Sequence, residues 1–414
     1  MKDALIQDLE DKLKQKDFKL NSLLEITTGI NNNQSVDQIT LIFEFILKEQ
    51  LGYEKFVLFN RQEEWNCLKK TGVKGKIKEI DVERDLLRFK EITVIESSHI
   101  PILNDFDTVI PVYHKEKPLA FLLLKSIVLD KNEQKKEGED KIDHLTFVQT
   151  LTNIIVVAIE NKRMAKQSIK QERLKKELEV ASEMQKLLFP QELPSDKRID
   201  LAASFKARHE VGGDYYDFIP LNDDEFIVCI ADVSGKGISA AMLMANFQAT
   251  IRTLINYQRF ELEFLIEELN KKVIKSTKGE KFITFFIGQY NAKTRKFKYI
   301  NAGHNHPILT DGKRARYLDK GCIGLGMLDE IPFIEPDEVE IKPNSTLVLY
   351  TDGVVELENK DGDFFETQRL VKLIHSFYPL KMEDLNNLIF SKLDEWRGDL
   401  RLEDDTAIFT CRIF

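Results

Sequence analysis

Aspartates at the ends of apolar runs constrain the fold of this 414-residue chain more than any other feature. The run 226–231 stops at Asp232, and the run 345–351 stops at Asp352. Asp404 precedes the run 406–414, and Asp214 follows two glycines. Strand interiors disfavour aspartate, and a buried carboxylate requires a partner. We therefore expect strands of the C-terminal half to carry these acids to one end of a shared core.

Carboxylates gathered in this way favour hard divalent cations. Oxygen ligands suit Mn²⁺ or Mg²⁺, and no His or Cys cluster has the spacing of a zinc site. Two ions about 3.5–4 Å apart can activate a bridging water for in-line attack on a phosphoryl group, without a phosphoenzyme. The cysteines are isolated beside apolar stretches, which predicts buried thiols: Cys67, Cys229, Cys322 and Cys411.

Each motif taken alone has a simpler explanation. Gly212-Gly213-Asp214 and Asp352-Gly353 have the composition of turns, and Asp404-Asp405 could be a surface pair. The Gly-Lys-Gly sequence at 235–237 lacks the remainder of a P-loop, so it does not predict nucleotide binding. Turn and helix-start roles explain the motifs separately, but they do not explain all of them in this order.

Together, the motifs resemble the SpoIIE-like and RsbU-like branch of the metal-dependent (PPM, type two-C) serine/threonine protein phosphatases. The matching segments follow the order of that family: 211–218 (VGGDYYDF), 231–237 (ADVSGKG), 301–304 (NAGH), 350–354 (YTDGV) and 404–407 (DDTA). Residues 184–190 (MQKLLFP) also resemble the helix that leads into these domains. The resemblance covers residues 181–414 and implies an α-β-β-α sandwich.

The resemblance also implies a role for each acid in binding two Mn²⁺ or Mg²⁺ ions. Asp232 would bridge both metals, and the backbone carbonyl of Val233 would complete one site. The second metal would be ligated, directly or through water, by Asp214, Asp352 and Asp404. Asp404 is preferred over its neighbour because the first acid of the pair fills the family's metal position. Asp405 stays in the predicted ligand set.

The roles of two histidines stay open. His304 could act as a general acid beside the metals, or it could hold backbone groups of a turn. The family does not use the position of His306 consistently.

SpoIIE-like phosphatases act on a serine or threonine of a small STAS-domain anti-anti-sigma protein. The resemblance therefore implies a phosphorylated STAS-domain substrate and a role in stress-response signal transduction.

The N-terminal half has a different pattern of predicted helices and strands. Helical patterns around Leu5, Leu9 and Leu13 and over 36–51 are followed by strand-like runs at 56–59, 93–95, 108–112 and 119–124. A turn at 115–118 predicts a hairpin, and a helix is expected over about 142–162. The order of these elements resembles a GAF domain, which implies an unknown small ligand or protein partner.

The predicted organisation has four parts and an α+β fold class. They are an N-terminal helix (1–20), a GAF-like sensory domain (21–162), a helical linker (163–190) and a PPM-type phosphatase domain (191–414). In the linker, a heptad-like seam with spacings of four and three residues predicts a coiled coil and a homodimer: Leu174, Leu178, Ala181, Gln185 and Leu188. We expect the sensor to act through this helix on the segment that bears Asp214.

Charge and hydropathy limit the partners. The formal net charge is −9, from 60 basic and 69 acidic residues that are interspersed, which argues against nucleic-acid binding. The N-terminus has no apolar signal core, and no apolar run is long enough to span a bilayer. We expect a cytoplasmic protein without membrane insertion.

Two other functions fit parts of the sequence. A Gly-Gly-Asp motif after a sensor is typical of diguanylate cyclases, but Tyr215 and Tyr216 stand where that family has Glu and Phe. A catalytically inactive regulatory binding module is the second alternative. The complete set of metal-binding acids argues against it.

Overall fold

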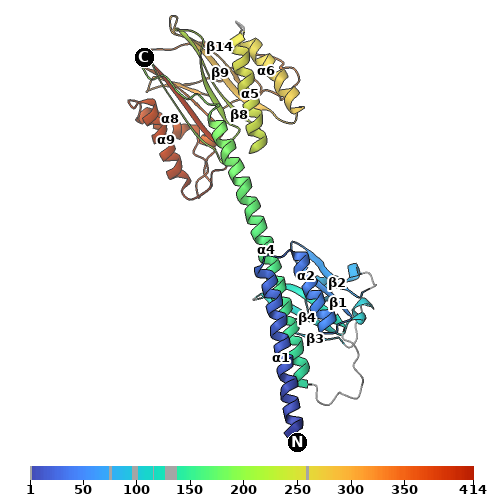
Figure 1. The fold of residues 1–414 in the computed structure, drawn as a ribbon. Helices are drawn as coiled ribbons and strands as arrows, with labels where there is room; N and C mark the ends of the chain where they lie inside the picture. Colours follow the sequence, from blue (N-terminus) through green and yellow to red (C-terminus); the bar gives the residue numbers. More distant parts are fainter. Residues whose placement is uncertain (1, 74–76, 96–100, 115, 126–137, 258–260) are drawn as a thin grey trace. The chain divides into compact units, whose positions relative to one another are not determined.

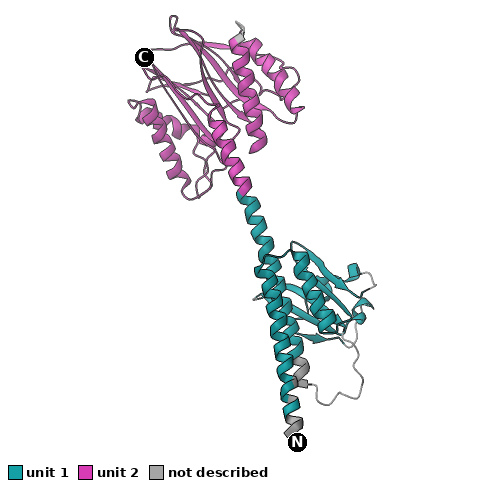
Figure 2. Ribbon diagram, in the orientation of Figure 1, with its two compact units in different colours: residues 1–172 teal, residues 173–414 magenta. Residues whose placement is uncertain are grey.

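The computed structural model describes residues 2–73, 77–95, 101–114, 116–125, 138–257 and 261–414. The chain divides into two compact units, residues 1–172 and 173–414 (Figure 2). The division falls within the long helix α4 (Gly138–Lys186), which contributes residues to both units. Among the described residues, no helix combines the length and the apolar character needed to cross a membrane.

Unit 1 is built on a five-stranded antiparallel sheet with the strand order β2-β1-β5-β4-β3. The strands are β1 (Lys55–Arg61), β2 (Trp65–Thr71), β3 (Thr93–Val94), β4 (Thr108–His114) and β5 (Lys117–Lys125). The other elements are α1 (Lys2–Asn31), α2 (Val36–Phe45), the π-helical turn η1 (Ile46–Gln50), η2 (Ile77–Glu79), α3 (Val82–Asp85) and η3 (Pro101–Asp105).

Both faces of this sheet are buried. Successive strand residues point to opposite faces, so β1 places Phe56 and Leu58 in a core shared with α1, α2 and α4. The alternate residues Val57 and Phe59 enter a second core under the segments around η2, α3 and η3. This explains why the four residues 56–59 of this strand are all apolar and do not alternate with polar residues.

The helices of unit 1 are longer than the sequence predicts. The helix predicted at 1–20 continues to Asn31, and the one predicted at 36–51 is α2 followed by η1. α2 begins at Val36 because Ser35 and Gln38 form a reciprocal capping box. In the predicted hairpin at 115–118, Lys115 lies outside the described residues, while His114 of β4 pairs with Lys117 of β5. The GAF-like assignment stays a prediction.

Unit 2 contains two further sheets. The first has the order β13-β10-β9-β8-β7, with β14 also paired to β10, and the second has the order β12-β11-β15-β16-β6. The strands are β6 (Ile199–Lys206), β7 (Tyr215–Pro220), β8 (Glu225–Val233), β9 (Ile283–Asn291), β10 (Lys296–Ala302), β11 (Ile308–Thr310), β12 (Ala315–Tyr317), β13 (Gly321–Cys322), β14 (Asp337–Glu340), β15 (Ser345–Tyr350) and β16 (Thr406–Ile413).

The two sheets pack face to face between pairs of helices (Figure 1). Helices α5 (Ile238–Tyr257) and α6 (Leu262–Thr277) cover the first sheet, and α8 (Thr367–Ser376) and α9 (Met382–Arg397) cover the second. Tyr216 and Phe409 meet between the sheets, with ring centroids 6.0 Å apart. The predicted α+β class and the α-β-β-α sandwich are confirmed; α8 and α9 are additional to the two helices predicted there.

Strand pairing gathers the predicted acids. β7 and β8 are antiparallel neighbours, so the residues before β7 lie beside the end of β8. β15 and β16 are likewise antiparallel, so the end of β15 lies beside the residues before β16. The short helix α7 (Asp352–Val355) begins directly after β15. All four acidic positions therefore lie at matching ends of strands.

Candidate active site

The acids of the four motifs lie at one edge of the sandwich. Asp214 precedes β7 and Asp232 is the penultimate residue of β8. Asp352 is the first residue of α7, and Asp404 lies two residues before β16. Asp214 is buried, with 1% of its surface exposed, whereas the other three are half-buried. The fold thus gives one inner carboxylate and three that reach solvent.

A buried hydrogen bond joins the two sheets at this edge. The Oγ1 hydroxyl of Thr351, at the end of β15, donates to Oδ2 of Asp214 at 2.7 Å. The same hydroxyl accepts from the backbone N–H of Ala407, at 2.9 Å. Thr351 therefore orients Asp214 from the opposite sheet. The sequence analysis missed this role, although a threonine directly before a predicted metal-binding aspartate was the available signal.

The carboxylates oppose one another's ionisation. Burial, followed by the charges of Asp232 and Asp405, raises the pKa of Asp214 well above its usual range. Burial and the charges of Asp352 and Asp404 raise the pKa of Asp232 to about 7. Burial, with Asp404 as the next cause, raises the pKa of Asp352 to about 6. A divalent cation would relieve this repulsion, so the donor set fits a hard metal.

Two of the carboxylates nevertheless have partners outside the acidic group. Among the described residues, no three His, Cys, Asp or Glu side chains converge in a ligating arrangement. Asp214 faces Thr351, and Oδ2 of Asp404 lies 2.6 Å from the ammonium of Lys236. The acids are close enough to repel one another, as their raised pKa values indicate, but their side chains do not point to a common centre. Rotation of a partly exposed carboxylate costs little free energy, so these side chains can turn toward a bound cation.

Asp405 has a different environment from Asp404. Its Oδ1 accepts from the backbone N–H of Arg208 at 2.8 Å, and its Oδ2 accepts from that of Gly213 at 2.7 Å. A Cβ on Gly212 would lie 2.4 Å from Oδ2 of Asp405, so only glycine allows this approach. Asp405 therefore holds the double-glycine turn in place, while Asp404 keeps an oxygen at the acidic edge.

The end of α4 forms two hydrogen bonds with the same turn. Gln185 Nε2 donates to the carbonyl oxygen of Gly212 at 2.7 Å, and the Gly212 N–H donates back to Gln185 Oε1 at 3.1 Å. Gln185 is 7% exposed. Gln185 and Leu188, two positions of the predicted dimer seam, thus face unit 2 itself, because Leu188 packs on the sandwich core. Two seam positions are therefore used within the chain.

Aromatic and ionic contacts anchor the strand that follows Asp214. Phe189, just after α4, stacks near Tyr216 of β7, with ring centroids 4.8 Å apart. Asp217 is fully buried and accepts two hydrogen bonds from the Arg252 guanidinium of α5, at 2.7 and 2.8 Å. Removing one member of such a pair leaves an uncompensated buried charge. β7 is therefore fixed on both faces.

His304 is placed as a buried link rather than as an exposed proton donor. Its backbone N–H donates a hydrogen bond to Oδ1 of Asn301 at 2.7 Å, and the ring atom Nδ1 lies 2.9 Å from Thr284 Oγ1. Nε2 is buried facing the Tyr350 backbone without good hydrogen-bond geometry. Burial lowers the pKa of His304 to about 3, so the ring is neutral at pH 7. His306 is exposed beside it.

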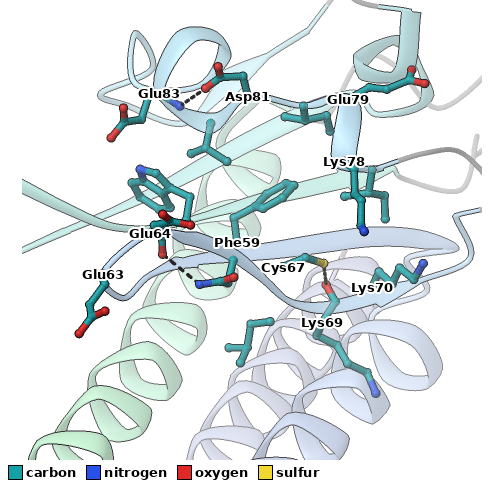
Figure 3. Close-up of a pocket in the computed structure, with 16 residues that line it drawn as sticks. Phe59, Glu63, Glu64, Cys67, Lys69, Lys70, Lys78, Glu79, Asp81 and Glu83 are labelled. Carbon is teal, nitrogen blue, oxygen red and sulfur yellow. Dashed lines mark hydrogen bonds between the residues drawn. The ribbon is translucent and has the colours of Figure 1, made fainter. Parts of the chain in front are cut away.

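A separate pocket of about 1230 Å³ lies in unit 1, between the β1-β2 edge and the η2-α3 segment (Figure 3). Figure 3 shows the lysines Lys69, Lys70 and Lys78 at one end, and Glu63 and Glu64 at the other. The indole Nε1 of Trp65, which also lines the pocket, is buried without a hydrogen-bond partner. The pocket therefore offers an apolar aromatic wall and both signs of charge.

The C-terminal part of the chain is similar to known proteins. The family model described as Stage II sporulation protein E (SpoIIE) matches residues 222–414. Phosphoserine phosphatase RsbU of Bacillus subtilis is 29% identical over 246 residues, which cover 58% of this chain and 71% of RsbU. Protein IcfG of Synechocystis is 28% identical over 264 residues, 57% of this chain and 41% of IcfG.

A solved structure shares the fold of the C-terminal unit. The SiaA-PP2C domain of Pseudomonas aeruginosa aligns with a TM-score of 0.53 at 19% identity, over 60% of this chain and 99% of that domain. Asp232, Asp352 and Asp404 lie inside the region matched by the family model, whereas Asp214 lies just before it.

Proposed function

We propose that the C-terminal unit, which is similar to SpoIIE-type phosphatases and shares the PP2C fold, hydrolyses phosphoserine or phosphothreonine in a protein with the aid of divalent cations. The observation that carries the proposal is the gathering of four carboxylates at one edge, with the Thr351–Asp214 hydrogen bond joining the two sheets. Carboxylates this close repel one another, and a bound cation would offset that repulsion.

The residues fit a two-ion site for Mn²⁺ or Mg²⁺. Asp232 and the Val233 carbonyl would hold one ion, and Asp214, Asp352 and Asp404 would hold the second, with Asp232 shared between the two. When bound, the ions would activate water and offset the charge of the phosphoryl oxygens. Thr351 orients Asp214, and Asp405 holds the turn before it, so both act by positioning a ligand. We assign Asp405 this supporting role.

The substrate that we propose is a phosphorylated STAS-domain protein in a stress-response signalling pathway. Support comes from the likeness to RsbU, which is named as a phosphoserine phosphatase. The open acidic edge also suits a phosphorylated side chain presented on a folded protein, because the half-buried acids reach solvent.

Asp232→Asn tests the assignment directly. It removes one carboxylate from the most crowded position, and it also relieves repulsion, so the variant should fold. We expect at least a hundredfold loss of Mn²⁺-dependent hydrolysis of a phospho-STAS protein, with circular dichroism and thermal unfolding unchanged or improved. A variant that retained turnover and its metal requirement would exclude the two-ion assignment. Wild type that lacked activity on every phosphoprotein would support an inactive binding module.

Cyclase activity is disfavoured by the surroundings of Gly-Gly-Asp. Tyr215 and Tyr216 are buried in β7, at 0% and 8% exposure, and pack within the sandwich. They are core residues and not a nucleotide-binding loop. Incubation with GTP should therefore yield no cyclic dinucleotide.

We further propose that unit 1 regulates this site through the end of α4. The contact that supports this is the pair of hydrogen bonds between Gln185 and Gly212, two residues before Asp214. A shift of α4 would move this turn and alter metal occupancy. If deletion of residues 1–170 changed neither metal affinity, nor turnover, nor dimerisation, the proposal would be wrong.

Dimerisation through the linker stays part of this proposal, with a revised surface. Because Gln185 and Leu188 face unit 2, the surface that we propose consists of three other apolar residues near the end of the linker: Val180, Met184 and Leu187, exposed by 56%, 59% and 63%. Their spacing of four and three residues places them along one stripe. Analytical ultracentrifugation of a Met184→Glu variant should show monomers where wild type is dimeric.

The regulating signal would be a small ligand in the pocket of unit 1 or a protein partner. A ligand with a planar apolar body would pack against the aromatic residues that line this pocket, Phe59 and Trp65. Binding can be followed by tryptophan fluorescence, with Trp65→Phe as the variant that loses the response and Trp396 as the remaining fluorophore.

A further inference from the structure

Lys236 lies beside the acidic edge in a defined position. It stands between Gly235 and Gly237, whose φ angles of +90° and +73° belong to the left-handed region. Its Nζ lies 2.6 Å from Oδ2 of Asp404 and donates to the carbonyl oxygen of Glu403 at 2.7 Å. The two glycines set the loop path, and the two contacts hold the ammonium over the segment that carries Asp404.

The ion pair occupies the Oδ2 oxygen of Asp404. Oδ1 of Asp404 accepts from the backbone N–H of Asp405 at 2.9 Å, so Oδ2 is the atom left for an external partner. Both oxygens of Asp405 are already used by backbone donors. Burial and Asp404 raise the pKa of Asp352, and the charge of Lys236 acts in the opposite direction. Lys236 thus offsets charge at two acids of the edge.

We propose that Lys236 is a built-in counter-ion of the acidic edge, which competes with a divalent cation for Asp404 Oδ2 and, once displaced, binds the phosphoryl group of the substrate. This inference rests on the proposed function. An ammonium 2.6 Å from the oxygen blocks ligation of a cation from the same direction. The side chain is 44% exposed, so it can leave without uncovering a core. Lysine is a flexible point charge, and lysines commonly bind phosphate.

Lys281 provides a matched control. Its Nζ donates to the carbonyl oxygen of Ser234 and contacts Ser239 Oγ, both at 3.1 Å, beside the same loop. Those partners are neutral oxygens, so Lys281→Met removes the same charge near the loop without breaking an ion pair to an acid of the edge. The comparison separates a specific counter-ion from a general effect of net charge.

The test uses full-length protein stripped with a chelator and then titrated with Mn²⁺ by calorimetry. We expect Lys236→Met to bind Mn²⁺ about two- to fivefold more tightly than wild type, because a competing partly exposed ion pair is lost. At saturating Mn²⁺ the KM for a phosphoserine protein should rise about tenfold, because a charged contact to phosphate is lost. Lys236→Arg should restore the KM, and Lys281→Met should leave Mn²⁺ affinity within about twofold of wild type.

The opposite shifts in metal affinity and KM form the signature, since a purely structural role would weaken both. Unchanged Mn²⁺ affinity in Lys236→Met, or equal tightening in Lys281→Met, would overturn the inference alone. Wild type that bound no Mn²⁺ would contradict the proposed function and this inference with it. Should Lys236→Met not fold, Lys236→Gln keeps a donor for the Glu403 carbonyl and replaces it in every measurement.

Discussion

The hydroxyl of Thr351 lies 2.7 Å from Oδ2 of Asp214, and this buried hydrogen bond connects the end of β15 with the residue that precedes β7. Thr351 also accepts from Ala407 N–H, so one side chain joins three segments of the acidic edge. The sheets could pack without this bond, but the inner carboxylate would then lack its donor. The contact therefore links the packing of the sandwich to the orientation of a proposed metal ligand.

Thr351→Val should lower both stability and metal affinity. Valine keeps the shape but removes the hydroxyl, which leaves Asp214 without a donor and Ala407 N–H without an acceptor. We expect a loss of about 1–3 kcal/mol in the free energy of unfolding, measured by urea denaturation. The Mn²⁺ concentration for half-maximal activity should rise severalfold. Thr351→Ser retains the hydroxyl and should stay close to wild type in both measurements; equal losses in the two variants would contradict this role.

Gln185→Leu should disturb the turn before Asp214 although the residue belongs to the linker helix. Leucine fills the volume but leaves the N–H and carbonyl of Gly212 unpaired. We expect the domain to lose about 1–3 kcal/mol of stability and a larger fraction of its activity. The neighbouring exposed Lys186→Gln is the control and should change neither quantity. Normal activity in Gln185→Leu would remove the contact from the regulatory route.

Asp404→Asn and Asp405→Asn should separate an effect on metal-dependent activity from an effect on stability. Asp405 accepts two backbone N–H groups, and asparagine can accept only through its single oxygen, so we expect a stability loss of about 1–3 kcal/mol. Asp404 is half-exposed, so its substitution should change stability by less than about 1 kcal/mol but greatly reduce Mn²⁺-dependent activity. The reverse pattern would assign the metal position to Asp405.

His304 should make the phosphatase unit sensitive to acid. Burial lowers the pKa of His304 to about 3, below its unfolded value of 6.5, so its contribution to stability is complete above pH 6.5. Between pH 6.5 and pH 3 the imidazole is protonated in the unfolded chain but neutral in the fold. Over this range, this group lowers the free energy of unfolding by about 1.4 kcal/mol per pH unit. His304→Gln should flatten that part of the stability profile in urea titrations. An unchanged slope would show that the ring is protonated in the fold.

Much of the fold can be predicted from local patterns in the sequence. The apolar runs that end at Asp232 and Asp352 are strands β8 and β15, because buried strands exclude charge until their ends. The order of the motifs resembles that of SpoIIE-like phosphatases, and the SpoIIE family model matches residues 222–414. Helices α8 and α9 were harder to predict, because their apolar residues are spaced among many charged ones and their partners lie on distant strands.

The linker shows where such patterns are ambiguous. A spacing of three and four residues places Leu178, Ala181 and Gln185 on one side of α4, whether that side meets a second copy or the chain's own domain. The structure turns Gln185 and Leu188 toward unit 2. Periodicity defines a face of a helix, but it does not define what covers that face.

The sequence alone determined which residue types stand at the strand ends and which turns require glycine, because these depend on neighbours along the chain. The tertiary structure decided how each carboxylate is used. Asp214 meets Thr351 across 137 positions, and Asp405 meets Gly213 across 192. Asp404 and Asp405 are adjacent and chemically identical, yet one faces Lys236 and the other faces backbone donors. Only the packing of two sheets brings such distant partners together, and hydrogen-bond geometry then separates their roles.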